Sequence, residues 1–221
     1  MSGIIDKISV CIERGKVSKA APYPPDLKDQ DGTDELTKKA LDQGESPAEI
    51  LEACNTGMQK IGDKFSRNEV FVPELLMAAK AMNAVMAHLK PHFQSGSIKT
   101  KGKFVLGTVA GDLHDIGKNL VSMVVEGNGW EVIDLGIDVK TDKFLTAVES
   151  NPGCIVGLSA LLTTTMGNMA STVKSIKDKY PETKVIVGGA PLTLQAAQDM
   201  GADAYAKDPQ EAVSYLDSAA G

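Results

Sequence analysis

Residues 103–121 of the chain read KFVLGTVAGDLHDIGKNLV. The first eight of these residues are mostly β-branched or aliphatic, which predicts a short buried strand. The residues from Ile116 onward are predicted to form a helix. A strand that runs into a helix is the first half of a βαβ unit, where ligands are usually held at the carboxyl end of the strand. His114, one of three histidines in the chain, lies at that junction.

The same alternation continues through the C-terminal part of the chain. Further short apolar runs are WEVIDLG (130–136), CIVGLSA (154–160), TKVIVGGA (183–190) and the shorter ADAYA (202–206). Helical segments separate these runs, and a closing helix is expected from about Pro209. Strands that alternate with helices indicate a parallel sheet. We therefore predict an α/β fold, with a five-stranded parallel sheet of flavodoxin-like or Rossmann-like type.

The first part of the chain predicts helices instead. Its apolar residues recur in steps of one, three or four positions, the spacing of one buried helical face. An example is the set Ile50, Leu51, Cys54, Met58, Ile61 and Phe65. Thr33 and Ser46 are each placed to cap a helix, because a side-chain oxygen can accept a bond from free backbone N–H groups. A last helix is expected from Pro73 to about Leu89, with Pro91 interrupting it beyond that point.

These patterns divide the chain into three parts. Residues 1–94, with four short amphipathic helices, predict a helical bundle. Residues 95–103 are polar and rich in Gly, Ser and Lys, which is typical of a linker. Residues 104–221 carry the predicted strands. We therefore expect a helical bundle domain, a linker and an α/β domain.

Composition narrows the functional classes. The net charge is −6 and the basic residues are scattered, so no nucleic-acid footprint is expected. No apolar run reaches the roughly 18 residues that a membrane span needs. The three cysteines are isolated, which favours buried thiols in a reducing compartment over disulfides. These features predict a cytoplasmic protein that does not bind nucleic acid or a membrane.

Polar residues and glycines gather at three predicted strand ends. Carboxyl ends of parallel strands meet at one edge of a sheet, so we expect these residues to lie close together. They are Asp112, His114, Asp115, Ile116 and Gly117 after the first strand, Ser159, Leu161, Thr163 and Thr164 at the third, and Gly188, Gly189 and Ala190 at the fourth. Taken singly, such a histidine is more often a structural hydrogen-bonding group, and paired glycines usually mark a turn.

Taken together, these residues predict a metal-binding imidazole. Such an imidazole needs its other nitrogen held by an acceptor, and Asp112 lies two residues before His114. We expect the Ser159 hydroxyl to hydrogen-bond Asp112 in turn. The three glycines would leave room for a bulky ligand against the backbone. With one strong metal donor the site is poor for bare zinc, which takes about three protein ligands, so the metal would have to arrive inside a macrocycle.

The pattern Asp-x-His-x-x-Gly, then 41 residues, Ser-x-Leu, then 26 residues, Gly-Gly resembles the signature of cobalamin-binding domains. This resemblance covers residues 103 to 221. It implies cobalamin bound base-off, with His114 as the axial ligand of cobalt in place of the cofactor's own benzimidazole. It further implies that Asp112 accepts the other ring N–H, and that Ser159 supports Asp112.

The N-terminal segment GDKFSRNEVFVPELLMAAKAM (62–82) adds a second resemblance. It is similar to the helical cap beside the cobalamin domain in methionine synthase and in small corrinoid proteins of methyltransferase systems. The resemblance implies that four apolar side chains cover the upper face of the corrin, namely Phe65, Val72, Leu75 and Leu76. From helical periodicity, the same four residues would be bundle core.

The combined resemblance implies a methyl carrier with little or no catalysis of its own. One partner, a substrate-specific corrinoid methyltransferase, would load the methyl group from a methanol, methylamine, betaine or methoxyaromatic donor. A second methyltransferase would pass it to tetrahydrofolate or coenzyme M, and a reductive activase would restore the cofactor. Two alternatives use similar folds: a cobalamin-dependent sensor or regulator, and a receiver domain with Asp112 as phosphoacceptor.

Overall fold

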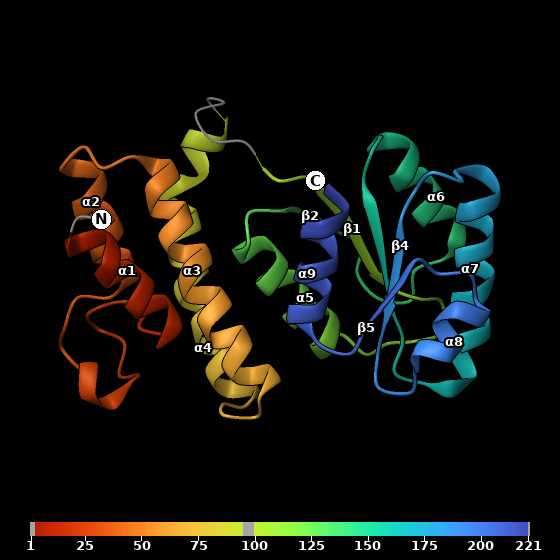
Figure 1. Ribbon diagram of the computed structural model, residues 1–221, viewed down its shortest axis with the longest axis horizontal. Coiled ribbons are helices and arrows are strands. Elements are labelled where there is room, and N and C mark those ends of the chain that lie inside the picture. Colours follow the sequence, from red (N-terminus) through yellow and green to blue (C-terminus); the bar gives the residue numbers. More distant parts are fainter. Residues whose placement is uncertain (1–2, 95–99, 221) are drawn as a thin grey trace. The chain divides into compact units, whose positions relative to one another are not determined.

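The structure, a computed structural model, describes residues 3–94 and 100–220. A helical unit lies within the first 100 residues, and an α/β unit comprises residues 101–126 and 130–221. Figure 1 shows the elements of each unit. The predicted order, helices first and then a parallel α/β domain, is confirmed.

Four α-helices form the helical unit within its described part. They are α1 (Gly3–Glu13), α2 (Thr33–Asp42), α3 (Pro47–Ser66) and α4 (Val72–Gln94), with a short 3₁₀ helix, η1 (Pro25–Leu27), between α1 and α2. The apolar face predicted for α3 is buried at Ile50, Leu51, Cys54, Met58 and Ile61. Regular apolar spacing therefore placed these helices correctly.

Of the two predicted helix caps, Thr33 is wrong and Ser46 is right in position. Gly32, not Thr33, precedes α2, and the Glu35 carboxylate accepts a bond from the Gly32 N–H at 2.9 Å. The Thr33 hydroxyl instead donates to the Ala81 carbonyl of α4 at 2.8 Å, which ties two helices together. Ser46 does precede α3, but its side chain makes no capping bond. In both cases, whether the hydroxyl bonds a free backbone N–H group depends on the direction of the side chain, which the sequence pattern does not specify.

Helix α4 continues through Pro91 to Gln94, so the expected interruption does not occur. Proline removes the N–H that would bond the carbonyl four residues earlier, at Ala87. Ala87 is exposed, so water can hydrate that carbonyl. In the same segment the His88 Nε2 atom lies 2.7 Å from Asp34 Oδ1 of α2, which places this histidine in a hydrogen bond between the two helices.

The α/β unit contains one five-stranded parallel sheet in order β2-β1-β3-β4-β5. Its strands are β1 (Lys103–Thr108), β2 (Glu131–Asp134), β3 (Ile155–Ser159), β4 (Val185–Gly188) and β5 (Ala204–Ala206). This is the flavodoxin-like strand order. The predicted fold class is confirmed.

Helices cover both faces of this sheet. They are α5 (Ile116–Gly127), α6 (Thr141–Ser150), α7 (Met166–Lys179), α8 (Leu194–Asp199) and α9 (Pro209–Ala220). Figure 1 shows α5 and α9 on one face and α6, α7 and α8 on the other. Phe144 of α6 and Val173 of α7 are fully buried against Val105 and Val156 of the sheet. Burial on both faces explains why the strands read as continuous apolar runs.

The ends of β1, β3 and β4 lie level with one another. Thr108 pairs with Ser159, and Ser159 pairs with Gly188. After β1 the chain passes to α5 on one face, and after β3 it passes to α7 on the other. The two connections diverge between adjacent strands and so create the crevice in which folds of this order bind ligands. That crevice carries the predicted site.

Candidate functional site

Asp112 is the buried centre of the site, with no exposed surface. Its Oδ2 atom accepts bonds from the backbone N–H groups of Leu161 at 2.7 Å and Leu162 at 3.2 Å, and from the Thr165 hydroxyl at 3.1 Å. Its Oδ1 atom accepts from the backbone N–H of His114 at 3.0 Å and from the ring Nδ1 of His114 at 2.8 Å. The carboxylate therefore joins the loop after β1 to the segment after β3.

These bonds keep the Asp112 carboxyl ionised. Burial favours the neutral acid, because a charge loses hydration in the interior. The N–H groups of Leu161 and His114 and the His114 ring outweigh this effect and hold the pKa of Asp112 well below its usual range. An ionised carboxylate offers only acceptor atoms, so every bond around it must come from a donor.

His114 is oriented by this carboxylate. Because Asp112 can only accept, the ring Nδ1 of His114 carries the proton in their 2.8 Å bond. The neutral ring then has its lone pair on Nε2, the arrangement found in metal-binding histidines with a carboxylate behind them. The His114 side chain is 52% exposed, so Nε2 is open to a ligand. The buried Thr108 hydroxyl also donates to the His114 carbonyl at 2.9 Å, which holds the backbone.

The expected bond from Ser159 to Asp112 is not made within the described part of the chain. Thr165, the last residue of the 3₁₀ helix η2 (Thr163–Thr165), supplies the hydroxyl instead. Ser159 still lies in β3, where its carbonyl accepts from Val109, and the chain has to turn beyond it before facing Asp112. Thr163 and Thr164 are exposed, whereas Thr165 is 5% exposed. The sequence does not indicate which of these three consecutive threonines faces inward.

The glycines of the site have two different roles. A Cβ atom added at Gly117 would meet no atom within 4 Å, which agrees with the predicted open space. A Cβ at Gly189 would lie 1.8 Å from the Ala160 carbonyl oxygen, and its φ is 133°. At Gly188 a Cβ would lie 3.0 Å from the Ala206 carbonyl oxygen. The fold itself therefore requires Gly189, and ligand clearance is not the reason for that residue.

Exposed apolar side chains lie on the connections after β1, β2 and β3, the first of which carries Asp112 and His114. These are Leu113, Ile116, Ile137, Leu161 and Leu162, each between 39% and 73% exposed. Large apolar residues grouped on a surface indicate a binding surface. Ile116 and Leu161 were predicted from the sequence, whereas Leu113, Ile137 and Leu162 were missed, since only their exposure distinguishes them. Among the other predicted residues, Asp115 and Ala190 are exposed at the loop edges.

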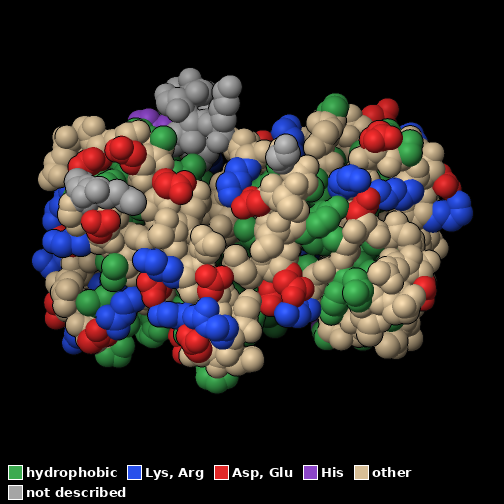
Figure 2. Space-filling model, in the orientation of Figure 1, with side chains coloured by type: hydrophobic (Ala, Val, Ile, Leu, Met, Phe, Trp, Pro, Cys, Tyr) green, Lys and Arg blue, Asp and Glu red, His purple; other side chains and the backbone are tan. Residues whose placement is uncertain are grey.

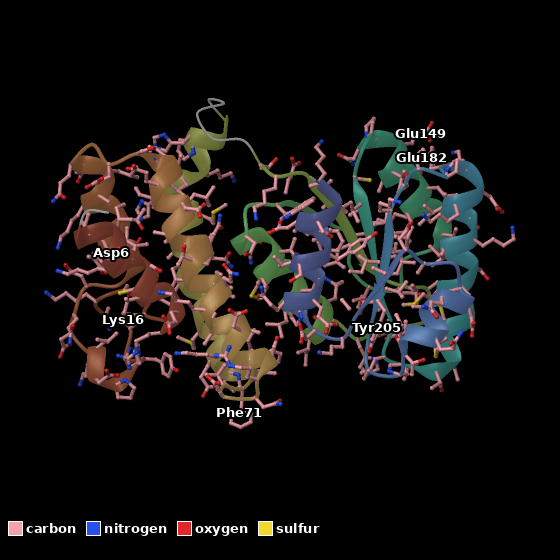
Figure 3. All side chains as sticks on the ribbon, viewed as in Figure 1. Asp6, Lys16, Phe71, Glu149, Glu182 and Tyr205 are labelled. Carbon is pink, nitrogen blue, oxygen red and sulfur yellow. The ribbon has the colours of Figure 1, made fainter. Side chains whose placement is uncertain are left out.

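In the helical unit, the predicted residues separate into surface and core. Val72 is 38% exposed, and Phe65 and Leu76 are half-buried. Leu75 is 1% exposed, so it is a core residue and presents no surface to a ligand. Phe71, which was not predicted, is 68% exposed, and Figure 3 shows its ring at the turn between α3 and α4, directed away from the helices.

Comparisons with known proteins identify the family. Residues 102–214 match the B12-binding domain family, and residues 29–90 match a second family described as a B12 binding domain. The chain belongs to the B12-binding corrinoid proteins. The α/β unit is thus a cobalamin-binding domain, and the helical unit corresponds to the cap that accompanies it.

Three relatives show the extent of this similarity. The trimethylamine corrinoid protein of Methanosarcina barkeri is 36% identical over 208 residues, which cover 92% of this chain and 95% of the relative. A cobalamin-binding protein from Desulfitobacterium hafniense has a TM-score of 0.78 at 30% identity, with 98% of each chain covered. The methanol:cobalamin methyltransferase complex of M. barkeri matches with a TM-score of 0.80 at 26% identity, covering 99% of this chain and 80% of that one. This corrinoid protein therefore resembles relatives of methylamine and methanol systems along nearly its whole length.

The residues at the crevice fit a corrinoid cofactor. In the described residues no group of three or more His, Cys, Asp or Glu side chains is arranged to hold a metal ion. A corrin supplies the equatorial nitrogen ligands of its own cobalt, so a single free imidazole nitrogen is sufficient. The exposed apolar residues around His114 would contact the apolar parts of such a ring.

The face of the molecule drawn in Figure 2 carries charges of both signs. On the face visible in Figure 2, Lys and Arg side chains are interspersed with Asp and Glu, so this face carries no extended field of one sign. Over the described ranges, none of the helices is both long enough and apolar enough to cross a membrane. The apolar residues of the crevice thus contrast with a mixed, charged surface.

Proposed function

We propose that this corrinoid protein is a methyl carrier that binds cobalamin base-off, with Nε2 of His114 as the lower axial ligand of cobalt. The observation that carries this proposal is the bond between Asp112 and the ring Nδ1 of His114, which leaves Nε2 free on an exposed ring. The imidazole lies at the switch point of the sheet, among exposed apolar side chains. When bound, the cofactor supplies a cobalt ion that accepts and releases a methyl group.

The protein contributes orientation and charge to this chemistry. Asp112 holds the His114 ring in one tautomer, and its negative charge makes Nε2 a stronger donor. Leu161, Leu162 and Thr165 in turn donate three bonds to Asp112, so the carboxylate cannot rotate freely.

We propose that the nucleotide tail of the base-off cofactor lies beside α5 and along the ends of β3 and β4. Gly117 has open space where a side chain would otherwise stand. The exposed residues Thr163 and Thr164 offer hydroxyl groups, and Ser159 and Gly188 line the adjoining strand ends. A tail with a phosphate and a ribose needs donors of this kind.

The helical unit would protect the opposite face of the corrin. Of the four residues expected to take this role, Leu75 is buried in the bundle, which leaves Phe65, Val72 and Leu76. Phe71, 68% exposed, adds an aromatic ring to this set. An apolar cover excludes water and oxidants from the position where a methyl group is held. Methyl donors and acceptors must still reach that position, so we propose that the cap moves aside, with residues 95–103 as a hinge; of these, 95–99 lie outside the described residues.

The partners follow from the relatives. We propose a substrate-specific methyltransferase as loading partner, since one relative is solved as a methanol:cobalamin methyltransferase complex. A methylamine or methanol donor is favoured over a betaine or methoxyaromatic one, because the relatives are named for trimethylamine and methanol systems. A second methyltransferase acting on tetrahydrofolate or coenzyme M, and a reductive activase, complete the proposed system.

The axial ligand can be tested by electron paramagnetic resonance of the protein reconstituted with cobalamin and reduced to Co(II). A ¹⁴N axial ligand splits each cobalt line into three, and a ¹⁵N ligand splits it into two. Protein labelled with ¹⁵N-histidine should therefore give doublets, since the ligand is the protein's own imidazole. Triplets from the labelled protein would show that the cofactor keeps its own base, and would overturn the base-off proposal.

Two histidine variants provide a matched comparison. His114→Ala should lose the nitrogen splitting and retain cobalamin poorly. His88→Ala removes a histidine that pairs with Asp34 on α2, so its splitting should equal that of the original chain. The carrier role is then tested by adding a trimethylamine or a methanol methyltransferase with a panel of donors. A change in visible absorption on methylation of the bound cofactor supports it, and no change with any pair contradicts it.

A further inference from the structure

The loop between β1 and α5 carries both Asp112 and His114, and neighbouring loops hold it from two sides. Strand β1 lies between β2 and β3 in the sheet. The loop after β1 can therefore be reached from the connection after β2 and from the connection after β3. Each of these connections supplies one exposed polar side chain to its backbone, namely Asp138 and Asn168.

On the β2 side, Asp138 makes two bonds to this loop. Its Oδ1 atom accepts from the Gly111 N–H at 2.7 Å, and its own N–H donates to the Asp112 carbonyl at 3.0 Å. Asp138 has a φ of 51°, in the left-handed region that aspartate tolerates better than most residues. Gly111 has a φ of 83°, so both residues joined by this hydrogen bond have a positive φ.

On the β3 side, Asn168 in the first turn of α7 donates from Nδ2 to the Ala110 carbonyl at 2.8 Å. The carbonyl of Ala110, the N–H of Gly111 and the carbonyl of Asp112 are thus held by groups outside the loop. These three consecutive residues end two positions before His114. Their restraint is independent of the bonds that the Asp112 side chain makes.

We propose that Asp138 and Asn168 are positioning residues for the cobalt ligand. By holding residues 110–112 from both sides, they order the loop before the cofactor arrives, so binding does not have to fix the position of His114. This inference rests on the proposed function, in which His114 binds cobalt. Both side chains are exposed and neither belongs to the buried core, so their loss leaves the packing of the sheet intact.

The first test uses the apoprotein, where no cofactor can mask the effect. Asn and Gly both accept a positive φ, and of the two only Asn retains an acceptor at Oδ1. Amide hydrogen exchange over residues 110–116 should be faster in Asp138→Gly than in Asp138→Asn, which should match the original chain. Asn168→Ala should also speed exchange there. Equal exchange in all four proteins would overturn the inference.

The second test measures the bound cofactor. Asp138→Gly and Asn168→Ala should each bind cobalamin about tenfold more weakly, the size of effect typical for groups that orient a metal ligand. The Co(II) form of each should show a reduced share of nitrogen-split signal, and Asp138→Asn should restore both values. Ser175→Ala removes a bond to the Ser171 carbonyl further along α7 and serves as the control. Its cobalamin affinity and its nitrogen-split signal should equal those of the original chain.

The outcomes separate this inference from the proposed function. If the original chain lacks the histidine nitrogen splitting, the proposed function fails and the inference fails with it. If the original chain shows the splitting and both variants keep it with unchanged affinity, the proposed function stands and only the positioning role is overturned. Should Asp138→Gly fail to fold, Asn168→Ala and its control still decide the question, because alanine is well tolerated in a helix.

Discussion

The Thr165 hydroxyl donates a hydrogen bond to Oδ2 of Asp112 across 3.1 Å, joining residues that lie 53 positions apart in the chain. Thr165 ends the short 3₁₀ helix after β3, whereas Asp112 lies in the loop after β1. This contact joins the connection after β3 to the loop that carries His114. It also gives the fully buried Asp112 carboxylate one of its hydrogen-bond donors.

Thr165→Val should destabilise the apoprotein by about 1–3 kcal/mol, because a buried charged acceptor loses a donor while the side-chain shape is kept. Thr165→Ser retains the hydroxyl and should lose much less. Urea unfolding of the two variants measures the difference. Equal stabilities would show that the hydroxyl does not support Asp112, and Ser159→Ala, which removes no bond to Asp112, should stay close to the original chain.

Gly189→Ala and Gly117→Ala should have opposite effects. At Gly189 the new Cβ would collide with the Ala160 carbonyl at 1.8 Å, so the apoprotein should lose several kcal/mol of stability, in the range that marks severe core defects, on the order of 4 kcal/mol. Gly117 lies in α5 with open space, so alanine there should stabilise the apoprotein by about 0.5–1 kcal/mol.

Cobalamin affinity provides the second measurement on this pair. Gly117→Ala should bind the cofactor more weakly despite its greater stability, because the methyl group enters the space proposed for the cofactor. Thermal unfolding and cobalamin titration together separate the two glycines. Unchanged affinity in Gly117→Ala would remove this residue from the proposed binding surface.

Asp203 should make the stability of the α/β unit depend on pH. Burial disfavours its charge, but the ion pair with Lys177 and the bond from the Val185 N–H prevail and hold the pKa of Asp203 below its usual range. A carboxyl whose pKa is lowered by folding contributes stability above its unfolded pKa of about 3.9, and that contribution is lost as the pH falls further.

Asp203→Asn should therefore be less stable than the original chain at neutral pH, with the difference shrinking as the pH is lowered from about 5 to about 3. Denaturant unfolding across this range measures it. Asp178→Asn breaks an exposed pair with Lys174 on α7 and should change stability by less than about 0.5 kcal/mol at any pH. A difference for Asp203→Asn that grows towards acid would contradict the assigned direction.

Phe65→Ala and Phe71→Ala should speed the loss of a bound methyl group under light or oxygen. Both rings belong to the apolar set proposed to shield the upper face of the corrin. The decay of the visible absorption of the methylated protein measures the rate. Val10→Ala removes an exposed apolar side chain from α1 and serves as control. Decay rates equal to that of the control would exclude a shielding role.

Local patterns predicted much of this protein from its sequence. The five strands and most helices followed from apolar spacing, since burial imposes a period of two or a continuous run on strands and about 3.6 on helices. The pair Asp112 and His114 was also predictable, because two residues on one short loop are close in any fold. The B12-binding resemblance rested on the same loop together with Ser159, Leu161 and the glycine pair at the end of β4.

The tertiary structure decided the contacts between segments that are distant in the sequence. Thr165 rather than Ser159 bonds Asp112, Gly189 avoids a clash with Ala160, and Leu75 is core although Val72 is surface. In each case the outcome depends on how the folded chain packs around the residue, which no local sequence pattern specifies. The sequence by itself therefore determined the elements and the pair Asp112 and His114, and folding determined which neighbouring groups hold that pair in place.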